Sequence, residues 1–150
     1  MLIHHEGSVV GVQLVKHYPP AHTDSDISVH FTGPDIFHTD DTFWNHTYPF
    51  LDYASGGSID GTIRAAEANV AKVTSKMIVI SGHGALGSKA DLVLFRDVLV
   101  EMRDKISALK KPGKSLAEVI AAKPGARTDD EWGKSFQGPA DFVALVYQGV

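Results

Sequence analysis

The sequence predicts an α/β fold: a mixed sheet of about five strands with helices packed on one face. Short apolar segments separated by turn residues occupy residues 1–55, a pattern typical of strands. Apolar residues recur at helical spacing over most of residues 58–150. One uninterrupted apolar run, Met77–Ile80, predicts an interior strand within this helical part. At 150 residues and 16.2 kDa, residues 1–150 are expected to form a single domain.

Four strands are expected in the first part of the chain. A hairpin turn at Glu6-Gly7-Ser8 separates the first two, and the pair Pro19-Pro20 ends the second. Val10, Val12 and Leu14 alternate with other residues, which predicts one apolar face on the second strand. Residues 42–58 are expected to form an ordered loop rich in aromatic residues. The four expected strands are Leu2–His5, Val9–His17, Ile27–Phe31 and Asp35–His38.

Helix-start signals divide the second part. Ser58 is placed to cap a helix that continues to Val73, and Ser88 begins a capping box before a long helix. Ser115 and Thr128 are expected to begin short helices, and Pro139 occupies the first position of the last one. Trp132 is expected in a small satellite core. The apolar stripe expected on the long helix comprises Leu92, Phe95, Leu99, Met102, Ile106 and Leu109.

Composition excludes several classes of function. The 14 Lys and Arg against 18 Asp and Glu give a net charge of −4, so a nucleic-acid partner is not expected. The absence of cysteine excludes disulfides, thiolate zinc sites and thiol catalysis. No apolar run is long enough to span a membrane, and the first residues do not resemble a secretory signal. A cytoplasmic location and no membrane partner are therefore expected.

Three short motifs place histidine and aspartate just after expected strands. They are AHTDSD at residues 21–26, HTDDT at 38–42 and SGHG at 81–84. Open sheets present ligands and catalytic groups at such strand ends. Imidazole and carboxylate without thiolate suit zinc, iron, manganese or nickel. One such histidine is more often a surface residue, but three in similar positions predict a metal site.

The glycine motif GHGALG, residues 82–87, also matches the G-x-G-x-x-G pattern of dinucleotide-binding proteins. The helix-start signal, however, lies at Ser88, after the third glycine. The glycines would then not form the helix N-terminus that holds a pyrophosphate. No second strand with an acidic tip follows, so this interpretation is disfavoured.

The segments PPAHTDSD, HTDDTFWNHTYPFLDYASGGSIDG and IVISGHG, in this order, resemble the second half of a metallo-β-lactamase-fold hydrolase. The similarity is greatest to hydroxyacylglutathione hydrolase-like metal-dependent hydrolases. It implies half of an αββα sandwich, with His22 as a ligand of the first metal and His83 closing the second site. Asp41 matches the catalytic carboxylate that bridges the two metals. The implied cofactor is a divalent metal, foremost zinc, for hydrolysis of an ester, thioester or lactam-type bond in a small-molecule substrate.

The chain departs from the family pattern in two places. Asp40 stands where the family has glycine, which predicts a strained loop. The HxHxDH motif is absent, and His4-His5 cannot replace it because neighbours on a strand point to opposite faces. The chain is then either an incomplete or weakly active hydrolase, or a non-catalytic half-domain that binds metal or a partner. A single ion held by His22, Asp41 and His83, and a metal-independent scaffold, remain alternatives.

One face of the predicted sheet has no helix to cover it. Alternating residues of Val10–Leu14 and Ile27–Phe31 would leave an apolar patch larger than monomers tolerate. The sequence therefore predicts a homodimer through this face, or a separate first-half chain as partner.

Other residues carry two interpretations each. Asp24 and Asp26 either orient His22 or form a turn, and the turn is favoured. His17, His30 and His46 are expected as exposed residues rather than ligands. Four aromatic residues could equally line a substrate pocket or fill the core: Trp44, Tyr48, Phe50 and Tyr53.

Overall fold

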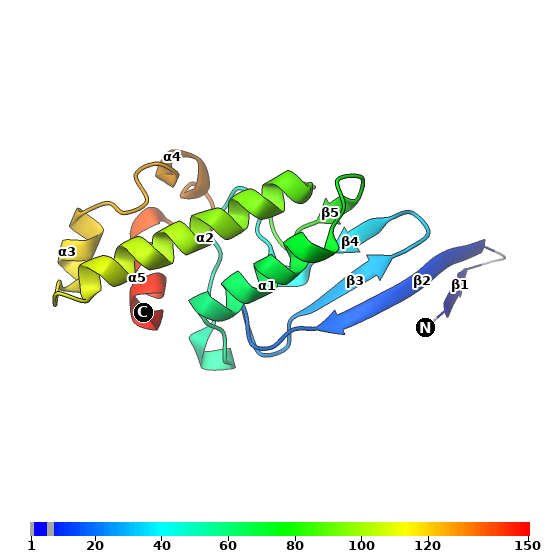
Figure 1. Ribbon diagram of the computed structural model, residues 1–150, viewed down its shortest axis with the longest axis horizontal. Helices are drawn as coiled ribbons and strands as arrows, with labels where there is room; N and C mark the ends of the chain where they lie inside the picture. Colours follow the sequence, from blue (N-terminus) through cyan, green and yellow to red (C-terminus); the bar gives the residue numbers. More distant parts are fainter. Residues whose placement is uncertain (1, 6–7) are drawn as a thin grey trace.

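The computed structural model describes residues 2–5 and 8–150, with side chains from residue 13 onward. Its strands follow the order β1-β2-β3-β4-β5, and all neighbours are antiparallel except β4 and β5, which are parallel. The predicted α/β fold with a mixed sheet is therefore confirmed (Figure 1). The strands are β1 Leu2–His5, β2 Ser8–His17, β3 Ile27–Phe31, β4 Ile36–His38 and β5 Ile78–Ile80.

The main sheet has four strands, because β1 and β3 pair with different parts of β2. Strand β1 pairs with Ser8–Val12, whereas β3 pairs with Gln13–His17. Figure 1 shows β1 beside the end of β2 that lies away from the helices. The hairpin turn expected at Glu6-Gly7 lies outside the described residues.

Most of the expected helix starts are confirmed. The Ser58 side chain accepts a hydrogen bond from Gly61 N, and Ser88 and Ser115 each form a full capping box. Pro139 lies in the first turn of α5. Thr128 also begins a short helix, α4, as predicted, but its side chain does not cap that helix, because the hydroxyl donates to the Gly125 carbonyl instead. The helices are η1 Asp40–Thr42, η2 Tyr53–Ser55, α1 Ile59–Lys72, α2 Lys89–Lys110, α3 Leu116–Ala121, α4 Asp129–Trp132 and α5 Pro139–Gly149.

The helices cover one face of the sheet. On that face the Tyr18 hydroxyl, just after β2, donates to Asn69 of α1, and Phe37 and Val79 of the strands join the main core. Figure 1 shows α1 and α2 side by side, with α3 and α5 toward the far end of α2. The predicted stripe of α2 is buried in this core except at its last member, Leu109, which is partly exposed.

Two element predictions need correction. Strand β5 lies at the end of the sheet rather than in its interior, and its free side forms an isolated bridge between Val79 and Gly87. The apolar run is explained by Val79, which is fully buried under the helices, while Ile78 is 48% exposed. Trp132 belongs to the main core instead of a satellite, because its ring stacks on Phe95 of α2.

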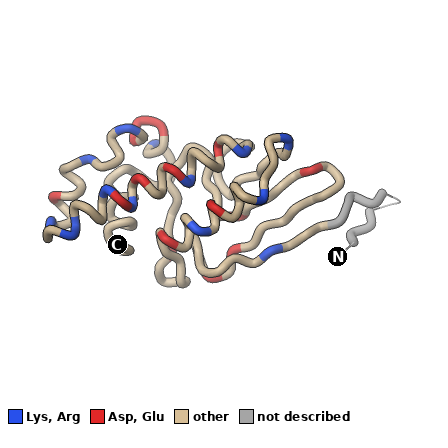
Figure 2. The backbone as a smooth tube through the Cα atoms, viewed as in Figure 1, with Lys and Arg blue, Asp and Glu red and all other residues tan. Residues whose placement is uncertain are grey.

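The other face of the main sheet is mainly apolar and is not covered by the helices. Residues that pair directly across strands share a face, so Val15, Val29, His38 and Ile80 line this side together with Phe31 and Ile36. The prediction that Leu14 of β2 lies on this uncovered face is wrong, because Leu14 pairs with His30, which lies on the helix side. Charged residues gather on the helices and loops, and β3, β4 and β5 carry none (Figure 2).

Among the described residues, no helix combines the length and the apolar character needed to cross a membrane.

Candidate metal centre

The carboxylate of Asp41 lies between the imidazoles of His22 and His83. Asp41 Oδ2 is 3.6 Å from His22 Nε2, and Asp41 Oδ1 is 3.3 Å from His83 Nε2. The three residues follow β2, β4 and β5, which all run in the same direction. Their carboxyl ends therefore meet at one edge of the sheet, and the predicted candidate residues come together there.

His22 is fixed in one orientation by the backbone of the aromatic loop. Its Nδ1 donates to the Phe50 carbonyl at 2.7 Å, which leaves the lone pair of Nε2 facing Asp41. The His22 carbonyl in turn accepts from Asp52 N. Gly57 makes this packing possible, since a Cβ there would lie 2.1 Å from the His22 carbonyl oxygen. A hydrogen bond at the second ring nitrogen is the usual way that proteins orient a metal-binding histidine.

Asp41 is placed by an unusual backbone conformation at the preceding residue. Asp40 has a φ of +52°, in the left-handed region that favours glycine, so the strain expected at this position is confirmed. The Asp40 N–H donates to His38 Nδ1 at 3.1 Å. Gly82 leaves room for the carboxylate, because a Cβ there would lie 2.3 Å from Asp41 Oδ1. Both positions thus shape the backbone around one carboxylate.

His83 is held against the ring of Trp44. The two ring centroids are 3.9 Å apart with an interplanar angle of 34°. The His83 carbonyl accepts from Asn45 N, and Asn45 Nδ2 donates to the carbonyls of Ala85 and Leu86 in the same loop. His83 remains 53% exposed, whereas the His22 side chain is 13% exposed. The centre therefore opens to solvent on the His83 side.

The donor set fits a bridging carboxylate better than a single-ion site. Each oxygen of Asp41 faces a different imidazole. Within the described residues, no group of three His, Cys, Asp or Glu side chains is arranged to hold one metal ion. His22, Asp41 and His83 would offer two imidazole nitrogens and one carboxylate, fewer donors than a complete two-metal centre requires when each zinc takes four. The residues present therefore fit only part of a metal centre.

Aspartates near His22 play the role of turn residues. Asp26 accepts hydrogen bonds from Thr23 N and Thr23 Oγ1, as the favoured interpretation of this loop predicted. Asp24 also belongs to the turn, where its N–H donates to the Ser55 carbonyl.

The predicted exposure of the remaining histidines is confirmed only in part. His17 is exposed as expected, with Nε2 2.9 Å from the Asp24 carbonyl. The prediction for His30 is wrong: it is only 8% exposed, because its strand position faces the helix layer. His46 is half-exposed and lies between two carboxylates, with Nδ1 2.5 Å from Glu131 Oε1 and Nε2 3.5 Å from Asp91 Oδ1. No local sequence pattern predicts the contact between His46 and Glu131, because the two residues are 85 positions apart.

The aromatic residues of the 42–58 loop divide between core and site. Tyr48 is fully buried and stacks on Phe142, and burial raises its pKa well above the ordinary value. Trp44 and Phe50 approach the centre, with ring centroids 6.0 and 6.1 Å from that of His22. Phe136, absent from the sequence predictions, contacts both of them.

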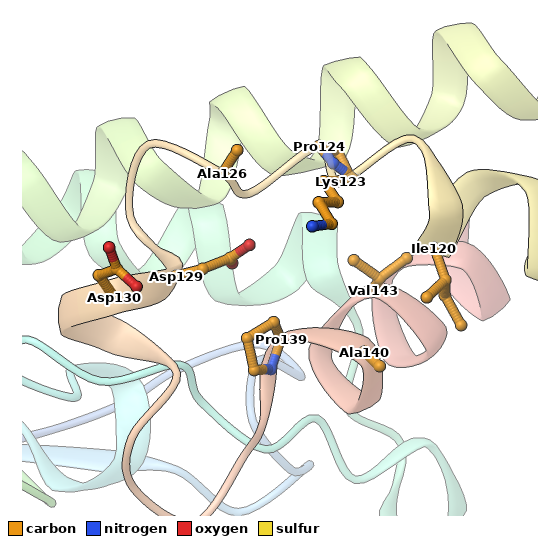
Figure 3. A pocket seen from close by; sticks show the side chains of 9 residues that line it. All are labelled: Ile120, Lys123, Pro124, Ala126, Asp129, Asp130, Pro139, Ala140 and Val143. Carbon is orange, nitrogen blue, oxygen red and sulfur yellow. The ribbon is translucent and has the colours of Figure 1, made fainter.

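A separate hollow of about 390 Å³ lies between α3, α4 and α5 and includes none of the three candidate ligands (Figure 3). Asp129, at its edge, accepts a hydrogen bond from the Tyr48 hydroxyl and so serves the core. The residues that line this hollow are Ile120, Lys123, Pro124, Ala126, Asp129, Asp130, Pro139, Ala140 and Val143.

Comparison with known proteins supports the fold. No family model and no curated protein matches the sequence. Among solved structures, a double mutant of the sec-alkyl sulfatase PisA1 superposes with a TM-score of 0.70 at 16% identity, over 91% of this chain. TMB-1 matches with a TM-score of 0.48 at 21% identity, over 63% of this chain and 47% of its own.

The likeness to the sulfatase shows that this chain shares its fold with one part of that protein. The chain spans 23% of the length of that sulfatase, so the likeness covers one part of a larger protein.

Proposed function

We propose that this chain supplies the carboxylate-bridged part of a divalent metal centre that hydrolyses an ester, thioester or lactam-type bond. The observation that carries the proposal is the position of Asp41 between two imidazoles, one of them locked through Nδ1. The fold shared with a sec-alkyl sulfatase supports a hydrolase and adds sulfate esters to the candidate substrates. Zinc is the foremost metal for such a donor set, with iron, manganese and nickel as further candidates.

The residues of the centre have distinct roles in this proposal. A divalent cation held there would supply Lewis acidity and a nucleophile at neutral pH. Asp41 balances positive charge with its two oxygens, and His22 and His83 offer neutral nitrogen donors. The Phe50 carbonyl fixes the tautomer of His22, and the Trp44 ring excludes water from one side of His83. Hydrolysis by this chain alone is expected to be slow, because the described residues supply only part of a donor set.

A hydrolysis assay tests this function. The pure chain is given a thioester, nitrocefin and a secondary alkyl sulfate, with added zinc or with a chelator. We expect turnover more than tenfold below the roughly 10 per second of ordinary enzymes. It should require metal, be lost in Asp41→Asn and persist in His17→Ala. Hydrolysis that survives both the chelator and Asp41→Asn would contradict the proposal, and turnover near that of ordinary enzymes would show that the centre is complete.

A second candidate function is self-association through the uncovered sheet face, and we propose a second copy of this chain as the occupant. The face carries exposed aliphatic residues, among them Val15 at 60%, Ile78 at 48% and Ile27 at 37%. No charged side chain interrupts it on β3, β4 or β5. An uncharged aliphatic surface is complementary to itself, which suits the same patch on two subunits related by a two-fold axis.

A further inference from the structure

Three aromatic side chains from distant parts of the chain form a wall beside the candidate metal centre. Phe136 lies between α4 and α5, and its ring centroid is 6.3 Å from that of Phe50 and 6.5 Å from that of Trp44. Both partners lie about 6 Å from the His22 ring. We call Trp44, Phe50 and Phe136 the aromatic wall.

The exposure of Phe136 needs a physical reason. The side chain is 73% exposed although its neighbour Trp44 is only 3% exposed. A solvent-exposed phenyl ring lacks the hydrophobic stabilisation that a buried ring gains. Ligand sites usually combine apolar surface with a few polar groups, as Phe136 and the neighbouring centre do. Phe136 also lines an open hollow of about 360 Å³, but the rest of that lining is largely polar and includes Gln137, Asp141 and Gln148. The apolar surface beside the centre is therefore the exposed ring of Phe136 itself, with the buried Trp44 ring behind it.

We propose that the aromatic wall binds an apolar group of the substrate, so that the preferred substrates carry an aryl or branched alkyl group beside the bond to be cleaved. This inference rests on the proposed hydrolytic function, because it places the reacting bond at Asp41. The wall carries no charge and no hydrogen-bond acceptor at Phe50 or Phe136, so it selects by apolar contact. A substrate with only an acetyl group offers little apolar surface to the wall and gains little from it.

Binding without turnover tests the wall directly. Phenylacetate and acetate are titrated into the zinc-loaded chain, with binding followed by calorimetry and by tryptophan fluorescence. We expect phenylacetate to bind at least about tenfold more tightly than acetate. In Phe136→Ala its Kd should rise about threefold to tenfold, the size of one lost aromatic contact, while the Kd of acetate stays unchanged. Leu14→Ala, a matched loss of an exposed apolar side chain on β2 outside the proposed dimer face, should change neither.

The outcomes separate this inference from the proposed function. If phenylacetate binds no better than acetate, or Phe136→Ala weakens both equally, the wall has no role, whatever the hydrolytic activity. If phenylacetate binding depends on Phe136 but no thioester is hydrolysed, the wall is supported and the hydrolytic function fails. Where the chain is active, a phenylacetyl thioester should show a lower KM than an acetyl thioester, and Phe136→Ala should remove that difference. Phe136 is exposed, so circular dichroism of Phe136→Ala should match the wild type.

Discussion

Asp40 adopts a left-handed backbone conformation so that the next residue, Asp41, can direct its carboxylate between two imidazoles. A non-glycine residue in this region costs about 1–2 kcal/mol. Aspartate tolerates this region better than most residues, and the Asp40 carboxylate accepts a hydrogen bond from Ile27 N at 3.4 Å. The unusual conformation therefore lies next to the carboxylate that we propose as a metal ligand.

Replacing Asp40 tests this account of the loop. Asp40→Val should destabilise the chain by about 1–2 kcal/mol, because a β-branched side chain is least compatible with positive φ. Asp40→Gly should unfold at a denaturant concentration close to that of the wild type. Both are measured by urea unfolding. An Asp40→Val variant as stable as the wild type would show that the backbone carries no strain there.

The sequence predicted that three candidate ligands lie close together, but not which aromatic residues surround them, for a physical reason. His22, Asp41 and His83 each follow a strand, and the common direction of β2, β4 and β5 brings them together. Phe136 joins the site through the packing of α4 and α5, about which local spacing carries no information. The burial of His30 likewise depends on the helix layer above its strand.

At the scale of the element, helix caps follow local rules when no tertiary partner competes. Ser88 and Ser115 bond within their own first turns, as their sequence patterns predicted. The Thr128 hydroxyl instead contacts the Tyr48 hydroxyl and the Gly125 carbonyl, so a buried partner overrides its local signal.

The cap of the long helix should contribute measurably to stability. Ser88→Ala removes the two hydrogen bonds of the Ser88 hydroxyl, with Asp91 N and with the Asp91 carboxylate, and leaves the bond from Ser88 N to that carboxylate. The substitution should lower the free energy of unfolding by about 1 kcal/mol. Ser75→Ala, at an exposed position before β5, is the matched control and should change little. The comparison is made by urea unfolding at neutral pH. Equal effects of the two substitutions would contradict this role of the capping box.

A surface network at α2 predicts a small dependence of stability on pH. Hydrogen bonds from Arg127 and Lys105 hold the pKa of Glu101 at about 2, below its ordinary value of 4.5. A lowered pKa in the folded state stabilises the chain above pH 4.5, and this contribution disappears as the pH falls toward 2.

Glu101→Gln should therefore destabilise the chain at pH 7 and have no effect near pH 2. The group is partly exposed, so the loss at pH 7 should be only a few tenths of a kcal/mol. Urea midpoints of the variant and the wild type at the two pH values provide the measurement. A destabilisation of the same size at both would mean that the carboxylate charge is not responsible.

At the scale of the whole molecule, the helices cover only one side of the sheet. The class of fold was readable from the division between strand-like and helix-like periodicity. The face on which Leu14 lies was not readable, because only the register with His30 places that residue on the helix side of the sheet. The opposite face joins residues of four strands into one apolar surface.

This surface predicts dimerisation. Light scattering should give about twice the 16.2 kDa mass of the chain at micromolar concentration. The double variant Val15→Glu with Ile78→Glu should be monomeric, because two dimer-related faces would then bury like charges. Leu86→Glu, at another exposed leucine in a loop, should stay dimeric. A monomeric wild type that binds no dye for exposed apolar surface would contradict the proposed contact.

The measurement that tests the central claim most directly is the zinc content and affinity of the purified chain. The wild type should bind zinc, and His17→Ala should bind it equally. The double variant His22→Ala with His83→Ala should no longer bind zinc stoichiometrically. In Asp41→Asn the zinc affinity should fall by more than the 10- to 100-fold that is typical when a residue supporting a metal ligand is replaced. Circular dichroism confirms that each variant is folded. If the double variant and Asp41→Asn retain wild-type zinc affinity, Asp41 and its two imidazoles are not a metal centre.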